Sequence, residues 1–135
     1  MEEIDILAIN DNLPQVLNFV EGALDELGCD DTTKSLIGTA VEEVFINIAS
    51  YAYPTETGTA TIRVATVSEP LSITMTFIDN GERFDPLAKP APDLKLPMSE
   101  RKKGGLGIFM VKKIMDSVKY EYKDGQNILT IVKNV

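Results

Sequence analysis

A carboxylate and a carboxamide stand four residues apart, as Glu43 and Asn47, in the stretch TAVEEVFINIASYAYP. The apolar spacing of this stretch predicts a helix, in which positions i and i+4 lie on one face, one turn apart. The pair can therefore present a base and a metal or water ligand to one small volume. The alternative is a helix with two polar residues on its solvent side. An asparagine between Ile46 and Ile48 on a largely buried helix, however, needs polar partners.

Asp79 ends an apolar run and is followed by Asn80-Gly81, the commonest signal for a hairpin turn. Against a hairpin, the next residues, GERFDP, lead into a proline-rich stretch and not into a clean return strand. An aspartate at the end of a buried strand can instead point its carboxylate into a pocket floor, where it accepts a hydrogen bond from an exocyclic amine. The sequence leaves both interpretations open.

A glycine-rich turn opens the last predicted helix: Gly104-Gly105-Leu106-Gly107. Glycine lets a backbone approach an anion, and the N–H groups at a helix N-terminus lack partners within the helix. Three cationic residues directly precede the turn, namely Arg101, Lys102 and Lys103. The turn is neither a Walker A motif, which needs Lys-Ser/Thr after its last glycine, nor a dinucleotide-binding fingerprint. A flexible hinge is the alternative to a phosphate-binding turn.

The composition is that of one soluble domain of 135 residues, with 44% hydrophobic and 25% charged residues. The net charge of −8 argues against a nucleic-acid-binding surface. No run of about 18 apolar residues is present, so no membrane span is expected. The acidic N-terminus lacks a signal-peptide pattern, and the single cysteine, Cys29, cannot form an internal disulfide. We therefore expect a cytoplasmic protein.

The sequence contains no histidine. This excludes Ser-His-Asp and Cys-His catalysis, histidine-containing zinc sites and a phosphohistidine on this chain. A single cysteine leaves no transition-metal cluster either. Any metal should therefore be a hard ion bound by oxygen atoms, such as Mg²⁺.

Three helices should position these segments. Helical spacing predicts them from Asp11-Asn12 to Gly28, from about Thr32 to Ala52, and from about Leu106 to Asp116. Asp11-Asn12 should cap the first helix, and Asp30 or Asp31 the second. The inward stripes of the second and third helices should include Leu36 and Met110.

Alternation and β-branched residues predict five strands, at Glu3–Asn10, Thr59–Val67, Leu71–Asp79, Val118–Lys123 and Ile128–Val132. Prolines and scattered charge between Asp85 and Lys103 predict a long loop, which is typical of a functional lid or a disordered segment. The order β α α β β loop α β β predicts an α+β fold. Antiparallel hairpins should form a sheet with the helices on one face, as a two-layer α/β sandwich.

In this order and spacing, three stretches resemble the N, G1 and G2 boxes of the GHKL (Bergerat-fold) ATP-binding superfamily: AVEEVFINIASYAYP, DNGERFDP and GGLGIFMVKKIMDSVKY. Within that superfamily the chain looks most like the bacterial anti-sigma-factor serine kinases, over nearly its whole length. The resemblance implies one histidine-kinase-like ATPase domain over residues 1–135. It also implies a mixed, mostly antiparallel sheet and an ATP lid at about residues 85–103.

The resemblance also implies a role for each segment. By match to that family, Glu43 would be the general base, and Asn47 would coordinate the Mg²⁺ that bridges the phosphates of ATP. Asp79 would bind the adenine amino group, and Gly81 would give room for the base. The phosphates would lie at the glycine-rich turn, against Lys103, Gly104, Gly105, Leu106 and Gly107.

This chain departs from the family pattern at three positions. Tyr51 stands where the family often has histidine, which replaces an imidazole with a phenol and bears on lid or partner contacts. Glu82 and Arg83 stand where a smaller residue and glycine are commoner. Arg83 could therefore narrow the pocket mouth, or it could reach a phosphate.

The resemblance implies a serine/threonine-protein kinase that binds Mg-ATP and phosphorylates a small antagonist, an anti-anti-sigma protein of the STAS type. The kinase would also sequester a sigma factor or similar regulator. The resemblance further implies that the chain forms a homodimer. One alternative is a non-catalytic GHKL-like module that binds nucleotide or only a protein partner. Another alternative is the detached catalytic domain of a histidine kinase. The small size of the chain and the amino-acid sequence of the third stretch disfavour it.

Overall fold

The computed structural model describes residues 1–68, 71–88 and 105–135. In chain order these residues form β1 (Glu2–Leu7), the 3-10 turn η1 (Asn10–Asn12), α1 (Leu13–Glu26), α2 (Asp31–Tyr51), β2 (Thr59–Ser68), β3 (Leu71–Asp79), the 3-10 turn η2 (Pro86–Ala88), α3 (Gly105–Ile114), β4 (Ser117–Lys123) and β5 (Gln126–Asn134). Every predicted helix and strand is present in this part of the chain. The first strand is shorter than predicted, because Asn10 begins η1.

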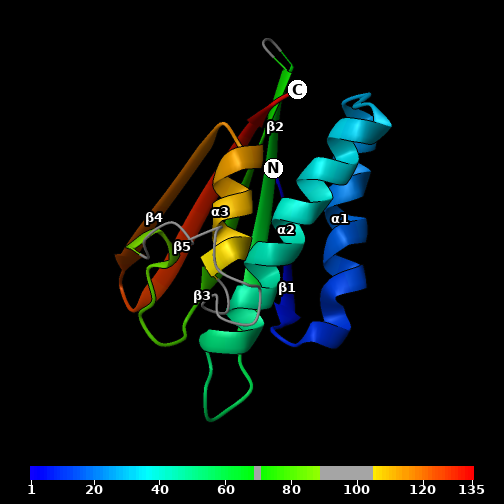
Figure 1. The fold of residues 1–135 in the computed structure, drawn as a ribbon. Helices are drawn as coiled ribbons and strands as arrows, with labels where there is room; N and C mark the ends of the chain where they lie inside the picture. Colours follow the sequence, from blue (N-terminus) through cyan, green and yellow to red (C-terminus); the bar gives the residue numbers. More distant parts are fainter. Residues whose placement is uncertain (69–70, 89–104) are drawn as a thin grey trace.

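The five strands form one sheet in the order β1-β2-β3-β5-β4. The helices α1, α2 and α3 lie over one face of this sheet (Figure 1), so the predicted two-layer α+β sandwich is confirmed. The expectation of a mixed sheet is wrong for the described strands, because each one runs antiparallel to its neighbours. The last hairpin enters the sheet with β5, not β4, beside β3.

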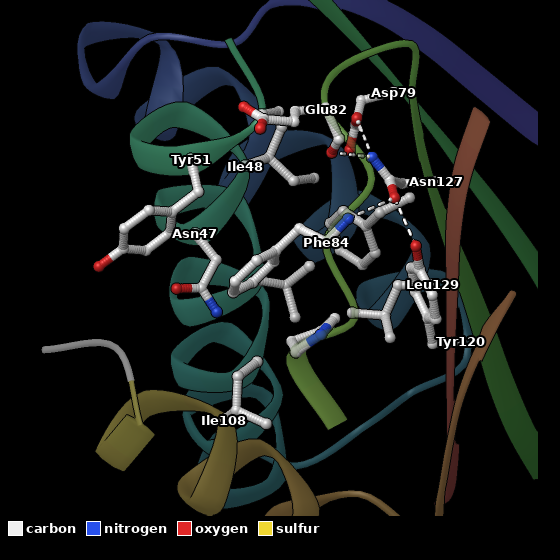
Figure 2. Close-up of a pocket in the computed structure, with 14 residues that line it drawn as sticks. Asn47, Ile48, Tyr51, Asp79, Glu82, Phe84, Ile108, Tyr120, Asn127 and Leu129 are labelled. Atoms are coloured by element: carbon white, nitrogen blue, oxygen red, sulfur yellow. Dashed lines mark hydrogen bonds between the residues drawn. The ribbon is translucent and has the colours of Figure 1, made fainter. Parts of the chain in front are cut away.

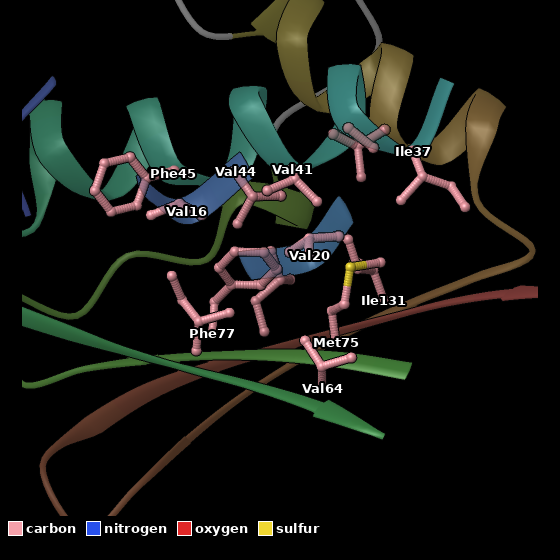
Figure 3. Close-up of a cluster of buried hydrophobic side chains, with 14 of the residues drawn as sticks. Val16, Val20, Ile37, Val41, Val44, Phe45, Val64, Met75, Phe77 and Ile131 are labelled. Carbon is pink, nitrogen blue, oxygen red and sulfur yellow. The ribbon is translucent and has the colours of Figure 1, made fainter. Parts of the chain in front are cut away.

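The core lies between the sheet and the inward face of α2 (Figure 3). Val41, Val44 and Phe45 of α2 belong to the same buried cluster as Met75 and Phe77 of β3. Burying a side chain of this size stabilises a fold by about 1.5–3 kcal/mol. The packing therefore fixes the helix that carries the Glu–Asn pair against the sheet.

The ends of the helices are set partly as predicted. Asp30 caps α2, since its side chain accepts a hydrogen bond from the Thr33 N–H at 2.7 Å. Gly28 follows α1 with a φ of 71°, a conformation that favours glycine. The prediction for the start of α1 is wrong: the Asn12 side chain does not cap the helix. Its Nδ2 atom instead donates to the Leu7 carbonyl at 2.9 Å, which joins α1 to the end of β1.

Two residues assigned to inward stripes lie at the surface. Leu36 of α2 is 44% exposed, and Met110 of α3 is 40% exposed. In α3 the buried positions are Ile108, Val111 and Ile114, which lie three residues apart on one helix face, and Met110 lies outside this face. None of the helices in the described part of the chain is long and apolar enough to cross a membrane.

Only the beginning of the predicted lid is described. Asp85 accepts a hydrogen bond from the Leu87 N–H at 2.9 Å, which forms the entry to η2. Residues 89–104 lie outside the described residues, and they include most of the predicted ATP lid together with Lys103 and Gly104.

Candidate functional site

A small cavity of about 40 Å³ lies between α2, α3 and the sheet. Its walls are mostly apolar, and they come from α2, β3, the segment after β3, α3, β4 and β5: Val44, Asn47, Ile48, Tyr51, Ala52, Phe77, Asp79, Glu82, Phe84, Pro86, Ile108, Tyr120, Asn127 and Leu129. In Figure 2, Asn47 and Tyr51 lie on the α2 side, and Asp79 and Asn127 lie on the sheet side. A few polar groups among apolar walls are typical of a small-molecule site.

Asp79 is the last residue of β3, and it is only 5% exposed. Its Oδ1 atom accepts hydrogen bonds from the Gly81 N–H and from Asn127 Nδ2, each at 2.9 Å. Burial raises the pKa of the Asp79 carboxyl, while these two hydrogen bonds act in the opposite direction. The hairpin interpretation of Asn80-Gly81 is wrong, because β3 pairs with β2 and β5 and the chain after Asp79 leads to η2.

Gly81 allows the segment after β3 to dock on the end of α2. A Cβ atom at position 81 would overlap the Ala52 carbonyl oxygen and its Cβ atom. The neighbouring Glu82 N–H donates to the same carbonyl at 2.8 Å. In this structure the space beside Gly81 is filled by Ala52, so close backbone packing is a sufficient reason for a glycine here.

Asn47 and Glu43 have different surroundings although they share one face of α2. Asn47 is half-buried and lines the cavity, and its side chain makes no hydrogen bond to another described residue. Glu43 is also half-buried, but it lies beyond the cavity lining, against the first turn of α3. Burial raises the pKa of the Glu43 carboxyl, and repulsion from Glu42 raises it further.

The predicted phosphate-binding turn forms the start of α3, as far as it is described. Gly105, Leu106 and Gly107 make up the first turn of the helix. A Cβ atom at position 107 would overlap Glu43 Oε2. The first turn of α3 therefore lies close to Glu43, the candidate general base on α2. Ile108 continues from this turn into the cavity wall. The N–H groups of a first helical turn have no partner within the helix and can bind an anion.

Asn127 is the main site residue that the sequence did not predict. It is 6% exposed, lies opposite Asp79 in the β3–β5 register, and lines the cavity. Its carboxamide also contacts the backbone of Glu82 and Phe84 and the Tyr120 hydroxyl. The available signal was a polar residue directly before the predicted strand Ile128–Val132, but only the observed strand register connects it with Asp79.

Two aromatic contacts define the edge of the site. The Tyr51 and Phe84 rings are stacked, with centroids 5.4 Å apart and an angle of 22° between their planes. Arg83 lies over the Tyr122 ring, with its guanidinium carbon 5.1 Å from the centroid. Neither Arg83 nor Tyr122 lines the cavity, so Arg83 does not narrow it here.

The sequence matches a known family over nearly its whole length: the histidine kinase-like ATPase domain matches residues 6–133. The chain is 27% identical over 93 residues to the serine/threonine-protein kinase BtrW of Bordetella bronchiseptica, which covers 69% of this chain and 65% of that protein. It is 29% identical over 94 residues to the serine-protein kinase RsbW of Bacillus cereus, which covers 67% and 58%. Each match spans less than two thirds of the relative's own length.

Two solved structures have a similar fold. The RsbU and RsbW domains of Rv1364c from Mycobacterium tuberculosis match with a TM-score of 0.65 and 15% identity, over 99% of this chain and 32% of that one. The histidine kinase domain of the blue-light-activated histidine kinase EL346 from Erythrobacter litoralis matches with a TM-score of 0.57 and 15% identity, over 90% and 60%. At this identity the likeness shows a common fold.

Proposed function

The chain belongs to the histidine kinase-like ATPase domain family, and on this premise we propose that it is a regulatory serine/threonine-protein kinase that binds Mg-ATP. The observation that carries the proposal is the meeting of three segments. Asn47 and Asp79 line one cavity, and Glu43 lies against Gly107 at the start of α3. The relatives that are named serine-protein kinases support the same reaction class.

Glu43 serves as the general base in this proposal. Its carboxylate accepts the proton of a serine or threonine hydroxyl while the hydroxyl oxygen bonds to the γ-phosphorus; the bond from phosphorus to the β–γ bridging oxygen breaks, and ADP leaves. The raised pKa of Glu43 makes its carboxylate a better proton acceptor than an exposed one. Among the described residues no side chain forms a hydrogen bond or ion pair with Glu43, which supports this role.

The donor set fits a magnesium ion that is held mainly by phosphate oxygens. Asn47 offers a carboxamide oxygen that no other described residue uses. Mg²⁺ keeps several waters, takes few protein ligands, and when bound neutralises phosphate charge. Asn47 would hold this ion, and the N–H groups of the first α3 turn, at Gly105, Leu106 and Gly107, would bind the phosphates. Lys103 and Gly104 stay predicted contacts outside the described residues.

The cavity must open to admit a nucleotide. Its volume is about 40 Å³, whereas binding sites for drug-sized ligands typically measure about 300–1,000 Å³. The Phe84 ring, stacked on Tyr51, lies between α2 and the sheet (Figure 2). We therefore expect Phe84 to move when adenine binds, with the Asp79 carboxylate accepting a hydrogen bond from the adenine amino group.

The proposed protein substrate is a small STAS-type antagonist, and the proposed regulatory target is a sigma factor or similar regulator. Similarity to BtrW and RsbW supports this assignment. Formation of a homodimer, a single domain over residues 1–135 and a cytoplasmic location belong to the same proposal. Neither nucleic acid nor a membrane is a proposed partner, because the net charge of −8 disfavours nucleic acid and the sequence has no run of about 18 apolar residues.

One observation favours a second candidate, a non-catalytic module that switches partners. The stacked Tyr51 and Phe84 rings line a cavity of only about 40 Å³, and Tyr51 stands where the family often has histidine. Such a module would bind its partner without using Glu43.

Affinity capture followed by phosphotransfer distinguishes the two candidates. The chain would be immobilised with ATP or ADP in cytosol of the native organism, and the captured proteins identified by mass spectrometry. A captured antagonist should then acquire label from γ-labelled ATP. Glu43→Gln should reduce this transfer by about 10²- to 10⁴-fold with little change in ATP affinity. The control Glu42→Gln, one position away, should retain transfer; ATP binding without transfer to a captured antagonist would favour the non-catalytic module.

A further inference from the structure

We infer that Asn127 is a positioning residue for base recognition, which sets the preference of the site for a base with an exocyclic amine. The inference rests on the proposed binding of ATP. It starts from the place of Asn127 in the sheet, where β5 brings it opposite Asp79, 48 residues earlier in the chain. Both side chains are almost fully buried at the sheet side of the cavity.

The carboxamide of Asn127 has all of its hydrogen-bonding groups in use. Nδ2 donates to Asp79 Oδ1 at 2.9 Å and to the Glu82 carbonyl at 2.8 Å. Oδ1 accepts from the Phe84 N–H at 3.1 Å and from the Tyr120 hydroxyl at 2.5 Å. A carbonyl only accepts and a backbone N–H only donates, so the two ends of the carboxamide cannot be exchanged. Asn127 therefore has no hydrogen bond left for a ligand, and it acts through its neighbours.

The first of these neighbours is the Asp79 carboxylate. Its Oδ1 atom already accepts from Gly81 and Asn127, whereas no described residue donates to Oδ2. Rotation of the carboxylate would break two buried hydrogen bonds, which is costly. Asn127 thus keeps Oδ2 as the acceptor that remains for a ligand. An oxygen of this kind favours a 6-aminopurine and disfavours a 6-oxopurine, which presents an acceptor at the same place.

The second neighbour is the segment that carries Phe84. Asn127 holds this segment at two points, the Glu82 carbonyl and the Phe84 N–H, and the Phe84 ring then stacks on Tyr51. Figure 2 shows these hydrogen bonds meeting at one side chain. The residue that orients the recognising oxygen therefore also fixes the backbone from which the cavity's aromatic side chain projects.

The test compares two nucleotides that differ only in the recognised group. Titration calorimetry would measure the affinity for Mg-ATP and for the magnesium complex of purine riboside 5′-triphosphate, which lacks the 6-amino group. The wild-type chain should prefer ATP by on the order of 10- to 100-fold, as expected for one hydrogen bond to a charged group. In Asn127→Leu this preference should fall to within about 3-fold, whereas a loss of overall structure would lower the affinity for both nucleotides to the same extent.

A neighbouring residue of β5 provides the matched control. Gln126 donates from Nε2 to Asn80 Oδ1 at 3.1 Å and does not line the cavity, so Gln126→Ala should keep the wild-type preference. Asn127→Asp serves if the leucine variant does not fold, because it keeps the shape and the acceptor but places an oxygen where Nδ2 donates. It should also lose the preference. A folded Asn127 variant that keeps the full preference overturns the inference, and a wild-type chain that does not bind ATP overturns the proposed function itself.

Discussion

Glu43 and Asp79 are two carboxylates whose pKa values are both raised by burial, yet their surroundings suit them to different tasks. Asp79 is held by two hydrogen-bond donors and is suited to recognition. Glu43 has no hydrogen-bond or ion-pair partner among the described residues and lies against the start of α3, so it is suited to accepting a proton. The sequence predicted both residues, but only their neighbours separate these tasks.

Glu42 should influence the pH dependence of phosphotransfer. Its negative charge is one cause of the raised pKa of Glu43, so Glu42→Gln should lower that pKa. The base is active when ionised, and the wild-type rate should therefore fall on acidification at a pH above 4.5, the ordinary pKa of a glutamate. In Glu42→Gln this fall should shift to lower pH, which a pH profile of kcat would measure. An unchanged or upward-shifted profile would contradict the assignment of Glu43 as the base.

Asp79→Asn should fold and should gain stability relative to the wild type as the pH rises. The raised pKa means that the folded chain keeps the Asp79 proton at pH values where the unfolded chain, with its ordinary value of 3.8, has lost it. The wild type therefore loses stability as the pH rises through the folded-state pKa. An asparagine can accept the same two hydrogen bonds without a buried charge. Urea unfolding between pH 4 and pH 7 would measure the difference, and no pH trend would show that the buried charge has no cost.

At the scale of elements, the site depends on the close approach of α2 and α3. Helical periodicity predicted both helices, and Asp30, one of the two predicted caps, marks the start of α2. The phase of α3 was less certain from sequence, since a short apolar helix offers several possible inward faces. The position of Ile108 in the cavity wall shows which face of α3 is inward. This position depends on how α3 packs in the tertiary structure, so the sequence of α3 alone does not predict it.

Gly107→Ala should impair catalysis more than stability. The new Cβ atom would overlap Oε2, the mobile end of the Glu43 side chain, so we expect the carboxylate to move while the helices stay packed. Phosphotransfer should fall at least about 10-fold, in the range of positioning effects, with a stability change of less than about 1 kcal/mol.

Gly38→Ala is the matched control for this substitution. Gly38 also lies in a helix, but its Cβ position faces open space. The change should leave phosphotransfer intact and stabilise the chain by about 0.5–1 kcal/mol. If Gly107→Ala keeps full activity, the contact between Glu43 and the first turn of α3 does not matter for the reaction.

At the scale of the whole molecule, the sheet assembles the recognition part of the site. The order of elements and the resemblance predicted the sandwich and named Asp79. They did not predict Asn127, because its role depends on β5 pairing with β3 in one register. The Asn80-Gly81 hairpin signal was likewise resolved only by the long-range pairing of β3. Contacts between distant parts of the chain are therefore what the sequence left open.

Substitutions in α2 should change the stability of the chain by very different amounts, depending on whether the side chain is buried in the core. Phe45 is fully buried, so Phe45→Ala should destabilise the chain by about 3–5 kcal/mol through lost burial and the cavity that remains. Leu36→Ala, at a largely exposed position of the same helix, should change stability by less than about 1 kcal/mol. Urea unfolding measures both, and equal losses would contradict the packing of α2.

The binding of Mg-ATP tests the central claim most directly, namely that Asn47, Asp79 and the start of α3 form one nucleotide site. Titration calorimetry of the wild-type chain should show saturable binding at one site. Asp79→Asn should weaken this binding by on the order of 10- to 100-fold, because an acceptor for the adenine amino group is replaced by a donor. No binding to the wild type, or equal affinity in a folded Asp79→Asn variant, would contradict the account.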